Sequence, residues 1–289
     1  MWWQEKCRNG TPPISLKRQG FILILNKRWH MSTINDKEIV KKQYENASNL
    51  NTRISIHDKY SVNKQGFGNW IVSNYQITDG MRILELGCGT EAMWTSKSDL
   101  IAKCAELVLT DFSEGMIRAA HNNIGDFPNV AYKVVDIQEI PFETNSFDIV
   151  IANMMLYHVP DLEKGLSEVR RVLRKGGKFY CATYGEHGIV PFIANLLKPY
   201  GVEDRVNKNF TLQNGKQILA QYFLSVEMLE YIDSLEVTNI DDMLDYIYSL
   251  TSMTEVSNIK KEVVKKILEK NMVDGVLKIP KEYGMFVCG

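Results

Sequence analysis

Apolar residues fall into two kinds of run along the middle of the chain, between about residues 75 and 184. Short apolar runs, which are typical of buried parallel strands, predict strands at 82–86, 106–110, 130–135, 147–152 and 178–183. Helical spacing predicts helices at about 92–104, 113–123 and 161–174. Ser113 is the expected cap of the second helix, and Gly176-Gly177 is the expected stop of the third. Such alternation predicts a parallel sheet with helices on both faces and right-handed crossovers.

The flanking segments have other patterns. Residues 35–75 predict a helical cap in front of the sheet. Beyond Tyr184 the alternation stops, and residues 186–221 read as an insertion with helices at 190–200 and 212–221. Its apolar residues suggest either a lid over a small ligand or ordinary packing of surface helices. A strand at 223–231, helices at 241–250 and 256–270, and a last strand at 285–288 follow.

Residues 1–30 differ from the rest, because they are basic and have poor apolar periodicity. We interpret them as a start-site artefact or a disordered extension, with Met31 as the natural start. The chain has no internal repeat and no low-complexity linker. We therefore expect a single domain over residues 31–289, with its core at about 75–184. The expected fold class is α/β, with a Rossmann-like, doubly wound and mostly parallel sheet.

Composition narrows the class of protein. An apolar fraction of 45% and a charged fraction of 24% are ordinary for a globular protein. A formal charge of -1 and the lack of a basic stripe argue against a nucleic-acid partner. The longest aliphatic run, Phe21–Leu25, is too short to span a bilayer, so we expect no membrane partner. Five scattered cysteines without CxxC spacing argue against disulfides and a metal site, and favour a cytoplasmic location.

Candidate chemistry gathers at the carboxyl ends of the predicted strands, where ligands bind in open α/β sheets. The first strand runs into the turn Gly87-Cys88-Gly89, which lets the backbone approach a ligand closely. The next three strands end in Asp111, Asp136 and Asn153. One such acid is usually a turn residue, but three polar strand ends beside a glycine turn indicate a binding site.

The glycine turn also satisfies a loose dinucleotide pattern, with Asp111 about 20 residues further on. A nicotinamide cofactor would place its pyrophosphate at the start of the following helix. Glu85 and Glu91 would bring negative charge close to that phosphate, which is costly. A ligand that carries an ammonium and a sulfonium, without phosphate, suits these acids better.

These residues resemble motifs of class I S-adenosylmethionine-dependent methyltransferases of the bacterial, small-molecule type. The motif-bearing segments are Glu85-Leu-Gly-Cys-Gly-Thr, Asp111-Phe-Ser-Glu-Gly-Met, Asp136 with 141–148, Asn153–Asp161, and Arg170–Lys178. The resemblance covers about residues 75–184. It implies a seven-stranded sheet, S-adenosylmethionine as cofactor and S-adenosylhomocysteine as product.

The resemblance also implies a role for each matched position. The turn Gly87–Gly89 would pass under the methionine part of the cofactor, and Glu85 would set its environment. Asp111 would accept hydrogen bonds from the two ribose hydroxyls, while Phe112 and Met116 pack on the adenine. Asp136 would accept from the adenine amino group and the backbone N–H of Ile137 would donate to the ring. Asn153 would face the cofactor's amino group or methyl group.

One position departs from the family pattern. The family usually has a third glycine where this chain has Glu91. An acid there either only modifies the first helical turn, where it is favoured by the helix dipole, or repels the cofactor's carboxylate.

The methyl acceptor and any general base stay open. His158, His57 and Tyr157 are candidates for a base, followed by Tyr184 and His187. Tyr44, His57 and Tyr60 either face the core or line the ligand pocket. The expected partner is a small-molecule acceptor, and the sequence does not predict the oligomeric state. Two alternatives remain, an NAD(P)-dependent oxidoreductase and a non-catalytic regulator that binds the cofactor.

Overall fold

The computed structural model describes residues 55–90, 93–250 and 253–289. The predicted extension 1–30, the first part of the helical cap, Tyr44 and Glu91 lie outside these residues. Within them, residues 55–60 are helical, and the helix α4 (Phe67–Ser73) follows after a turn. The described part of the cap is thus helical, as predicted.

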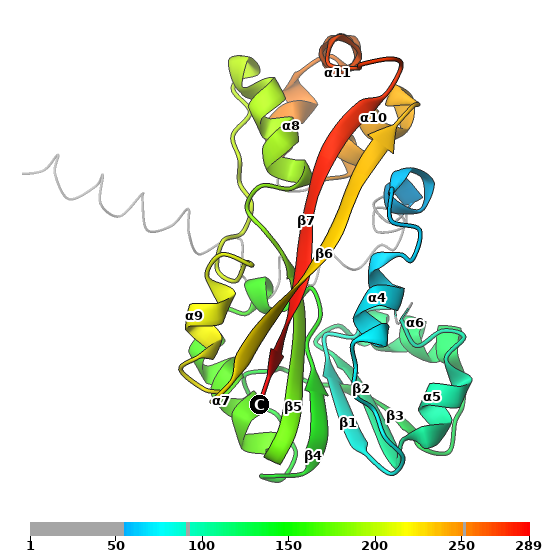
Figure 1. The fold of residues 1–289 in the computed structure, drawn as a ribbon, viewed down its shortest axis with the longest axis vertical. Helices are drawn as coiled ribbons and strands as arrows, with labels where there is room; N and C mark the ends of the chain where they lie inside the picture. Colours follow the sequence, from blue (N-terminus) through cyan, green and yellow to red (C-terminus); the bar gives the residue numbers. More distant parts are fainter. Residues whose placement is uncertain (1–54, 91–92, 251–252) are drawn as a thin grey trace, which may run out of the picture.

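One seven-stranded sheet organises the molecule (Figure 1), in the order β3-β2-β1-β4-β5-β7-β6. Its strands are β1 (Arg82–Leu86), β2 (Glu106–Asp111), β3 (Val130–Val134), β4 (Phe147–Ile151), β5 (Leu173–Tyr184), β6 (Val226–Val237) and β7 (Leu277–Cys288). The first five pair in parallel, whereas β7 runs antiparallel to both β5 and β6. This confirms the predicted Rossmann-like, mostly parallel sheet.

The strand order reverses at β1, because β1 pairs with β2 on one side and with β4 on the other. In open α/β sheets this switch point is where a crevice opens beyond the strand ends. The glycine turn follows β1 directly, so the fold brings it to the expected place.

Helices cover both faces of the sheet, because the strands are apolar on both sides. On one face, α4, α5 (Ser98–Lys103) and α6 (Glu114–Ile124) pack on a cluster that includes Ile83 and Leu107. On the other face, α7 (Leu162–Val172) and α9 (Gly215–Leu219) pack on a cluster that includes Leu84 and Val108. Ser113 caps α6 as predicted, since its hydroxyl accepts from the backbone N–H of Met116.

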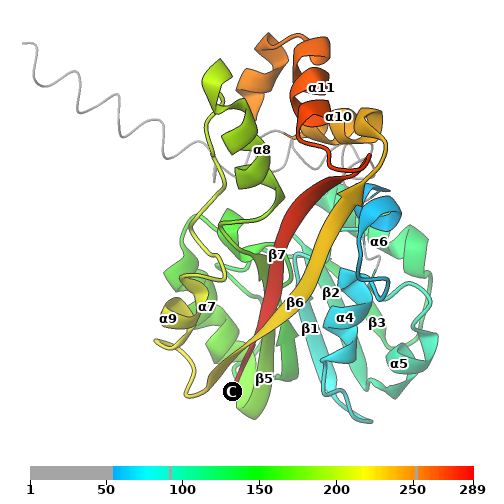
Figure 2. The same cartoon turned by 45° about the horizontal axis from the view of Figure 1, so that its top comes forward.

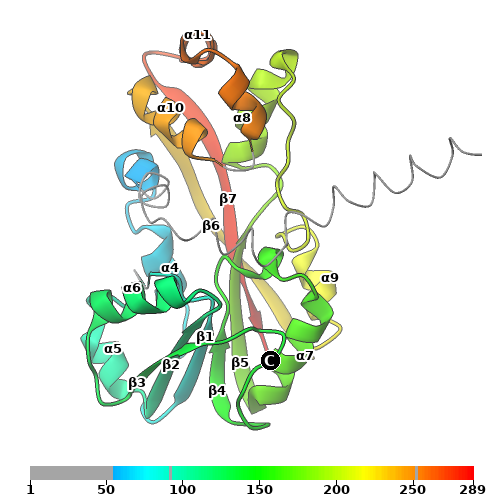
Figure 3. The ribbon, with the colours of Figure 1, turned by 180° about the vertical axis from the view of Figure 1, so that it is seen from behind.

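Strands β6 and β7 form a long antiparallel ribbon that rises beyond the rest of the sheet (Figures 1 and 2). The helices α8 (Ile189–Leu197), α10 (Ile240–Ser249) and α11 (Lys261–Lys270) gather around its far end. They build a second apolar core with residues of the ribbon, such as Leu235 and Ile279, and with Ile56 of the cap. Seen from behind, α8, α10 and α11 lie at one end of the ribbon, whereas α5 and α6 lie beside β1 to β3, away from that end (Figure 3).

Short 3-10 turns complete the chain, at Leu156–His158, Lys198–Tyr200 and Thr254–Asn258. The second turn forms the end of the helix predicted at 190–200, and the third overlaps the start of the helix predicted at 256–270. The predicted helix 212–221 is shorter, because only Gly215–Leu219 is helical.

Five predicted elements have wrong boundaries. The strands predicted at 178–183 and 223–231 extend over Leu173–Tyr184 and Val226–Val237. The helix predicted at 161–174 ends at Val172, and Gly176-Gly177 lies inside β5 and does not stop the helix. Of the predicted helix 92–104, the described residues are helical only at 98–103. The strand predicted at 285–288 begins eight residues earlier, at Leu277, and it contains Pro280. Among the described strands, only β6 pairs with β7 at Pro280, so the missing N–H is tolerated there.

The second core yields a test of what holds the ribbon. Leu235 on β6 is fully buried in this core, whereas Ile232 on the same strand is 77% exposed. Leu235→Ala should lower the free energy of unfolding by about 2–5 kcal/mol, because it removes buried surface and leaves a cavity. Ile232→Ala, the matched control, should change it by less than about 0.5 kcal/mol. Urea unfolding followed by circular dichroism measures both, and equal effects would contradict the proposed core.

Candidate active site

The turn after β1 has the backbone conformation that its glycines permit. Gly87 and Gly89 both lie in the left-handed region, with φ of 69° and 61°. A Cβ on Gly87 would come within 2.8 Å of the Met155 side chain, whereas a Cβ on Gly89 would meet nothing within 4 Å. Gly87 is therefore required by packing. Gly89 instead leaves its backbone open toward the space above the turn.

That space is a cavity of about 790 Å³. Nine of the ten residues predicted to bind a cofactor line it, namely Gly87, Cys88, Gly89, Asp111, Phe112, Met116, Asp136, Ile137 and Asn153. They come from the ends of four neighbouring strands, as the sheet order requires. The volume falls within the usual range for pockets that bind small molecules.

Asp111, at the end of β2, faces the glycine turn. Its carboxylate accepts from the backbone N–H of Gly89 at 3.0 Å and from that of Ser113 at 2.8 Å. Burial raises the pKa of Asp111, and its backbone hydrogen bonds oppose this effect. A carboxylate offers about four acceptor positions, so Asp111 retains capacity for a ligand.

Asp136 follows β3 and is held by its neighbour Gln138. Its Oδ1 accepts from the backbone N–H and from the side-chain amide of Gln138, both at 3.0 Å. Gln138 also accepts from the backbone N–H of Asp161, at the start of α7. Gln138 lines the cavity and was missed in the sequence, although its position two residues after Asp136 is a common one for such a contact.

Glu85 is the predicted residue that does not line the cavity. It is 1% exposed and lies under the turn, where its Oε2 accepts from the indole N–H of Trp94. Its Oε1 is buried without a hydrogen-bond partner among the described residues. Burial raises the pKa of Glu85 to about 7, although Trp94 and the nearby amide of Asn153 favour the ionised form.

Asn153 connects this buried acid to the sheet. Its Oδ1 accepts from the backbone N–H of Ala182 at 3.1 Å, and its Nδ2 donates to the hydroxyl of Tyr75 at 2.6 Å. The amide is 6% exposed. Asn153 is therefore anchored by protein groups at both ends, which favours a positioning role over a direct contact with a ligand.

The candidate bases differ in whether they line the cavity. His57, Tyr157 and His158 line the cavity, whereas Tyr184 and His187 do not. Tyr157 and His158 come from the turn after β4, and the ring centroids of Tyr157 and Tyr184 are 4.5 Å apart.

The prediction that Tyr60 lines the pocket is wrong. Tyr60 is absent from the cavity wall, because its place on the helix directs it toward α10, where its hydroxyl donates to Asp242 at 2.6 Å.

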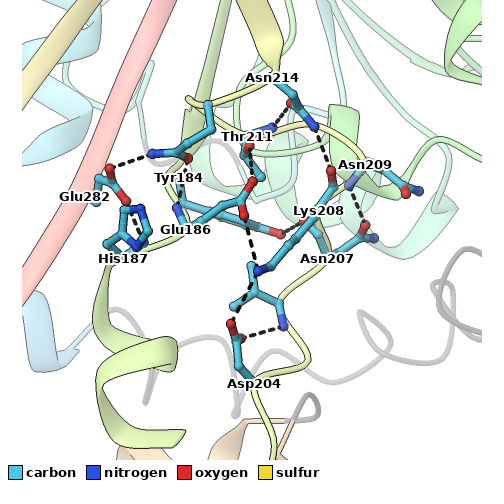
Figure 4. A network of polar contacts seen from close by, with 12 residues as sticks. Tyr184, Glu186, His187, Asp204, Asn207, Lys208, Asn209, Thr211, Asn214 and Glu282 are labelled. Atoms are coloured by element: carbon cyan, nitrogen blue, oxygen red, sulfur yellow. Dashed lines mark hydrogen bonds and ion pairs between the residues drawn. The ribbon is translucent and has the colours of Figure 1, made fainter. Parts of the chain in front are cut away.

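Polar contacts join the start of the insertion to its later part and to β7 (Figure 4). Glu186 accepts from the Thr211 hydroxyl at 3.0 Å and pairs with Lys208 at 3.2 Å. Glu282 of β7 accepts from the backbone N–H of His187 at 2.6 Å. No residue between 186 and 221 lines the cavity. Two of the three apolar clusters, the one around Leu84 and the second core, take side chains from this segment. The insertion thus packs on the cores, which was the second of the two interpretations.

Several cavity residues gave no signal in the sequence. Met155 packs under Gly87, and the far wall is formed by Ser61, Phe67, Lys281 and Tyr283. Lys281 and Tyr283 were missed because the strand that carries them was predicted to begin only at residue 285. Apolar and polar residues alternate from Leu277 to Ile279, and this pattern would have predicted an earlier start for that strand.

The part of the chain that the structure describes contains no group of three or more His, Cys, Asp or Glu side chains placed to hold a metal ion. None of its helices combines the length and the apolar character needed to cross a bilayer.

Known proteins are similar to this chain in both sequence and fold. Residues 84–181 match the family model described as a methyltransferase domain. The chain is 31% identical over 150 residues to a demethylmenaquinone methyltransferase of Staphylococcus aureus, an alignment that covers 50% of this chain and 60% of that protein. The chain thus spans less than two thirds of the length of the curated relatives that it matches.

Solved structures agree in fold. A putative methyltransferase from Bacillus halodurans superposes with a TM-score of 0.53 at 14% identity, covering 76% of this chain and 97% of that one. A Haemonchus contortus phosphoethanolamine N-methyltransferase, solved with S-adenosyl-L-methionine, gives a TM-score of 0.53 at 19% identity, covering 84% and 57%.

Residues 84–181 are thus similar to methyltransferase domains, and the sheet around them has the class I, Rossmann-like fold. The resemblance inferred from the motifs is confirmed.

The buried Glu85 generates a prediction on pH and stability. Below about pH 4.5 its carboxyl is neutral in both folded and unfolded chains. As pH rises toward 7 the unfolded chain ionises while the folded one stays protonated, so folding stability falls. The loss is about 3 kcal/mol by pH 8. Glu85→Gln should therefore flatten this fall, as measured by urea unfolding between pH 4.5 and 8.

The control for this experiment is Glu114→Gln on α6, whose side chain is exposed. It should retain the pH profile of the unmodified chain. A profile for Glu85→Gln that is parallel to that of the unmodified chain would contradict the burial of an uncompensated carboxyl.

Proposed function

We propose that this protein transfers a methyl group from S-adenosylmethionine to a small-molecule acceptor. The observation that carries the proposal is the pairing of an open glycine turn with a buried, incompletely paired carboxyl beneath it. The turn accepts a ligand close to its backbone. A positive charge there would favour the ionised form of the Glu85 carboxyl, so that the two charges stabilise each other.

The described residues fit the cofactor in three places. A Cβ at Gly89 would extend into the space above the turn, so a glycine there leaves room for the methionine part of the cofactor. Asp111 has acceptor capacity for the two ribose hydroxyls, and the half-exposed Phe112 lies beside it at the cavity wall. Asp136 and the backbone N–H of Ile137 would hold the adenine edge, with Met116 against the ring.

The cofactor supplies a methyl group activated by a sulfonium. A lone pair of the acceptor forms the new bond to the methyl carbon while the carbon–sulfur bond breaks and its electron pair stays on sulfur. The protein aligns the acceptor and excludes water from it, and a base is needed only when the acceptor must lose its proton early. His57 and His158 line the cavity and are the candidates for that role.

Relatives suggest where to begin with acceptors. The curated relatives are named for demethylmenaquinone, a small molecule. That name supports a small-molecule acceptor for this chain and makes demethylmenaquinone the first compound to assay.

Calorimetric titration tests the cofactor. S-adenosylhomocysteine should bind, whereas NAD should not, because the acids around the turn disfavour its pyrophosphate. Binding of NAD alone would overturn the proposal in favour of an oxidoreductase. Binding of S-adenosylhomocysteine without methyl transfer to a broad acceptor panel would favour a regulator.

Asp111→Ala tests the assignment of the ribose. Loss of two charge-assisted hydrogen bonds should weaken binding of S-adenosylhomocysteine by about 100-fold or more. Asp99→Ala, at an exposed position on α5, should leave the affinity unchanged. Equal affinity in the two variants, measured by calorimetry, would show that Asp111 does not hold the ribose.

A further inference from the structure

The cavity has a second half that the cofactor residues do not explain. Its wall there comes from residues 57–69 of the cap and from Lys281 and Tyr283 of β7. These residues lie on the ribbon side of the cavity, whereas the cofactor residues lie at the ends of β1 to β4.

A buried ion pair forms the centre of this wall. Lys281 pairs with Asp233 on β6, and their side chains are 2% and 0% exposed. Asp233 also accepts from the backbone N–H groups of Asn63 at 2.9 Å and Ser234 at 2.8 Å. Its negative charge is therefore stabilised from three directions, and the Lys281 ammonium is not its sole partner.

Lys281 and Ser61 retain unused donors. The ammonium has three N–H groups, of which one faces Asp233 and one donates to the Ser61 Oγ at 2.7 Å. Ser61 accepts that bond, so its own O–H is free to donate elsewhere. Neither group has a further hydrogen-bond acceptor among the side chains that the structure describes, and both line the cavity.

Aromatic rings surround these donors. The Lys281 ammonium lies 5.6 Å from the ring of Tyr231 and 5.5 Å from that of Tyr283. Phe67 lies against both tyrosines, with ring centroids 5.2 Å and 5.1 Å apart, and it lines the cavity together with Tyr283. Flat apolar walls next to a pair of donors suit a planar ring that carries an oxygen.

Stability alone does not account for this arrangement. Replacing a buried ion pair by apolar groups is often neutral or even stabilising, because both charges lose their hydration. The wall also holds His57, whose ring Nδ1 is buried without a hydrogen-bond partner among the described residues. Unused donors and an unpartnered ring nitrogen on one cavity wall indicate a polar group of a ligand.

We propose that Ser61 Oγ and Lys281 Nζ bind the oxygen of an aromatic hydroxyl acceptor in its phenolate form, with the ring against Phe67 and Tyr283. The proposal rests on the proposed function in that it names the acceptor class for the same cavity. It concerns binding of the acceptor, and the phenolic proton goes to solvent when the phenolate binds.

A binding assay with 4-nitrophenol tests the site without knowledge of the natural acceptor. The phenolate is coloured, so its absorbance reports both binding and ionisation. Nitrobenzene, which has the same ring without the hydroxyl, is the matched ligand. The full chain should bind 4-nitrophenolate in preference to nitrobenzene, and binding should raise the ionised fraction of the phenol at a fixed pH.

Two variants separate recognition from folding. Ser61→Ala should weaken binding of 4-nitrophenolate by about 10-fold, and Lys281→Met with Asp233→Asn by about 30-fold or more. The double variant avoids leaving Asp233 as an unpaired buried charge. The matched control is Lys278→Met with Glu236→Gln, a largely exposed pair on the same two strands, which should bind as the unmodified chain does. Affinity for nitrobenzene should be the same in all of them.

The titrations are made with and without S-adenosylhomocysteine, whose own affinity is measured for each variant. Failure of S-adenosylhomocysteine to bind the unmodified chain would refute the proposed function, and the phenolate titration would still test this site. The proposal is overturned if the chain does not prefer 4-nitrophenolate to nitrobenzene. It is equally overturned if the folded variants bind 4-nitrophenolate with the same affinity as the control variant. That result would mean that the ion pair only holds residues 61–66 in place.

Discussion

The antiparallel pairing of β6 with β7 is the constraint on which both halves of the molecule depend. This ladder runs without interruption from Val226 to Val237. Only the last six residues of β7 also pair with β5. One half of the ribbon therefore completes the sheet, and the other half carries the second core with α8, α10 and α11. The cavity lies where the ribbon meets the sheet, because Lys281 and Tyr283 of β7 line it together with residues at the ends of β1 to β4. The six pairs between β7 and β5 join these two walls.

Charge is distributed unequally along the cavity. The cofactor half contains Asp111 and Asp136 at its surface and Glu85 just below it. The ribbon half contains the buried Lys281–Asp233 pair, in which the two charges balance and the ammonium keeps an unused N–H donor. A cationic cofactor would meet negative charge at one end, and an anionic acceptor would meet hydrogen-bond donors at the other. Fixed groups at both ends would hold the two reactants in one orientation, which lowers the cost of aligning them.

The sequence predicted the cofactor half well because that half depends on local signals. Buried strands read as short apolar runs, and the polar residue after each strand falls at a sheet edge whose geometry is general. Gly87 and Gly89 could be assigned for the same reason, since a positive φ restricts the residue type. The sequence could not predict the ribbon half. Ser61, Asp233 and Lys281 are far apart in the chain and meet only through strand pairing. Pro280 also made the segment before residue 285 look unlike a strand. Nothing in the sequence around Tyr60 indicated that its hydroxyl would donate to Asp242 on α10.

The placement of β7 between β5 and β6 has a consequence for the order in which the protein folds. Both neighbours precede β7 along the chain, so β5 has an unpaired edge and β6 has no described partner strand until residues 277–288 are available. Pairings across such sequence distances form slowly, and an open edge strand is a template for association with other chains. The pairings around β1 and β4 need no residue beyond β5, whereas the wall that carries Lys281 can form only when β7 pairs. A chain without β7 in place would have the cofactor half of the cavity but not the wall proposed to hold the acceptor.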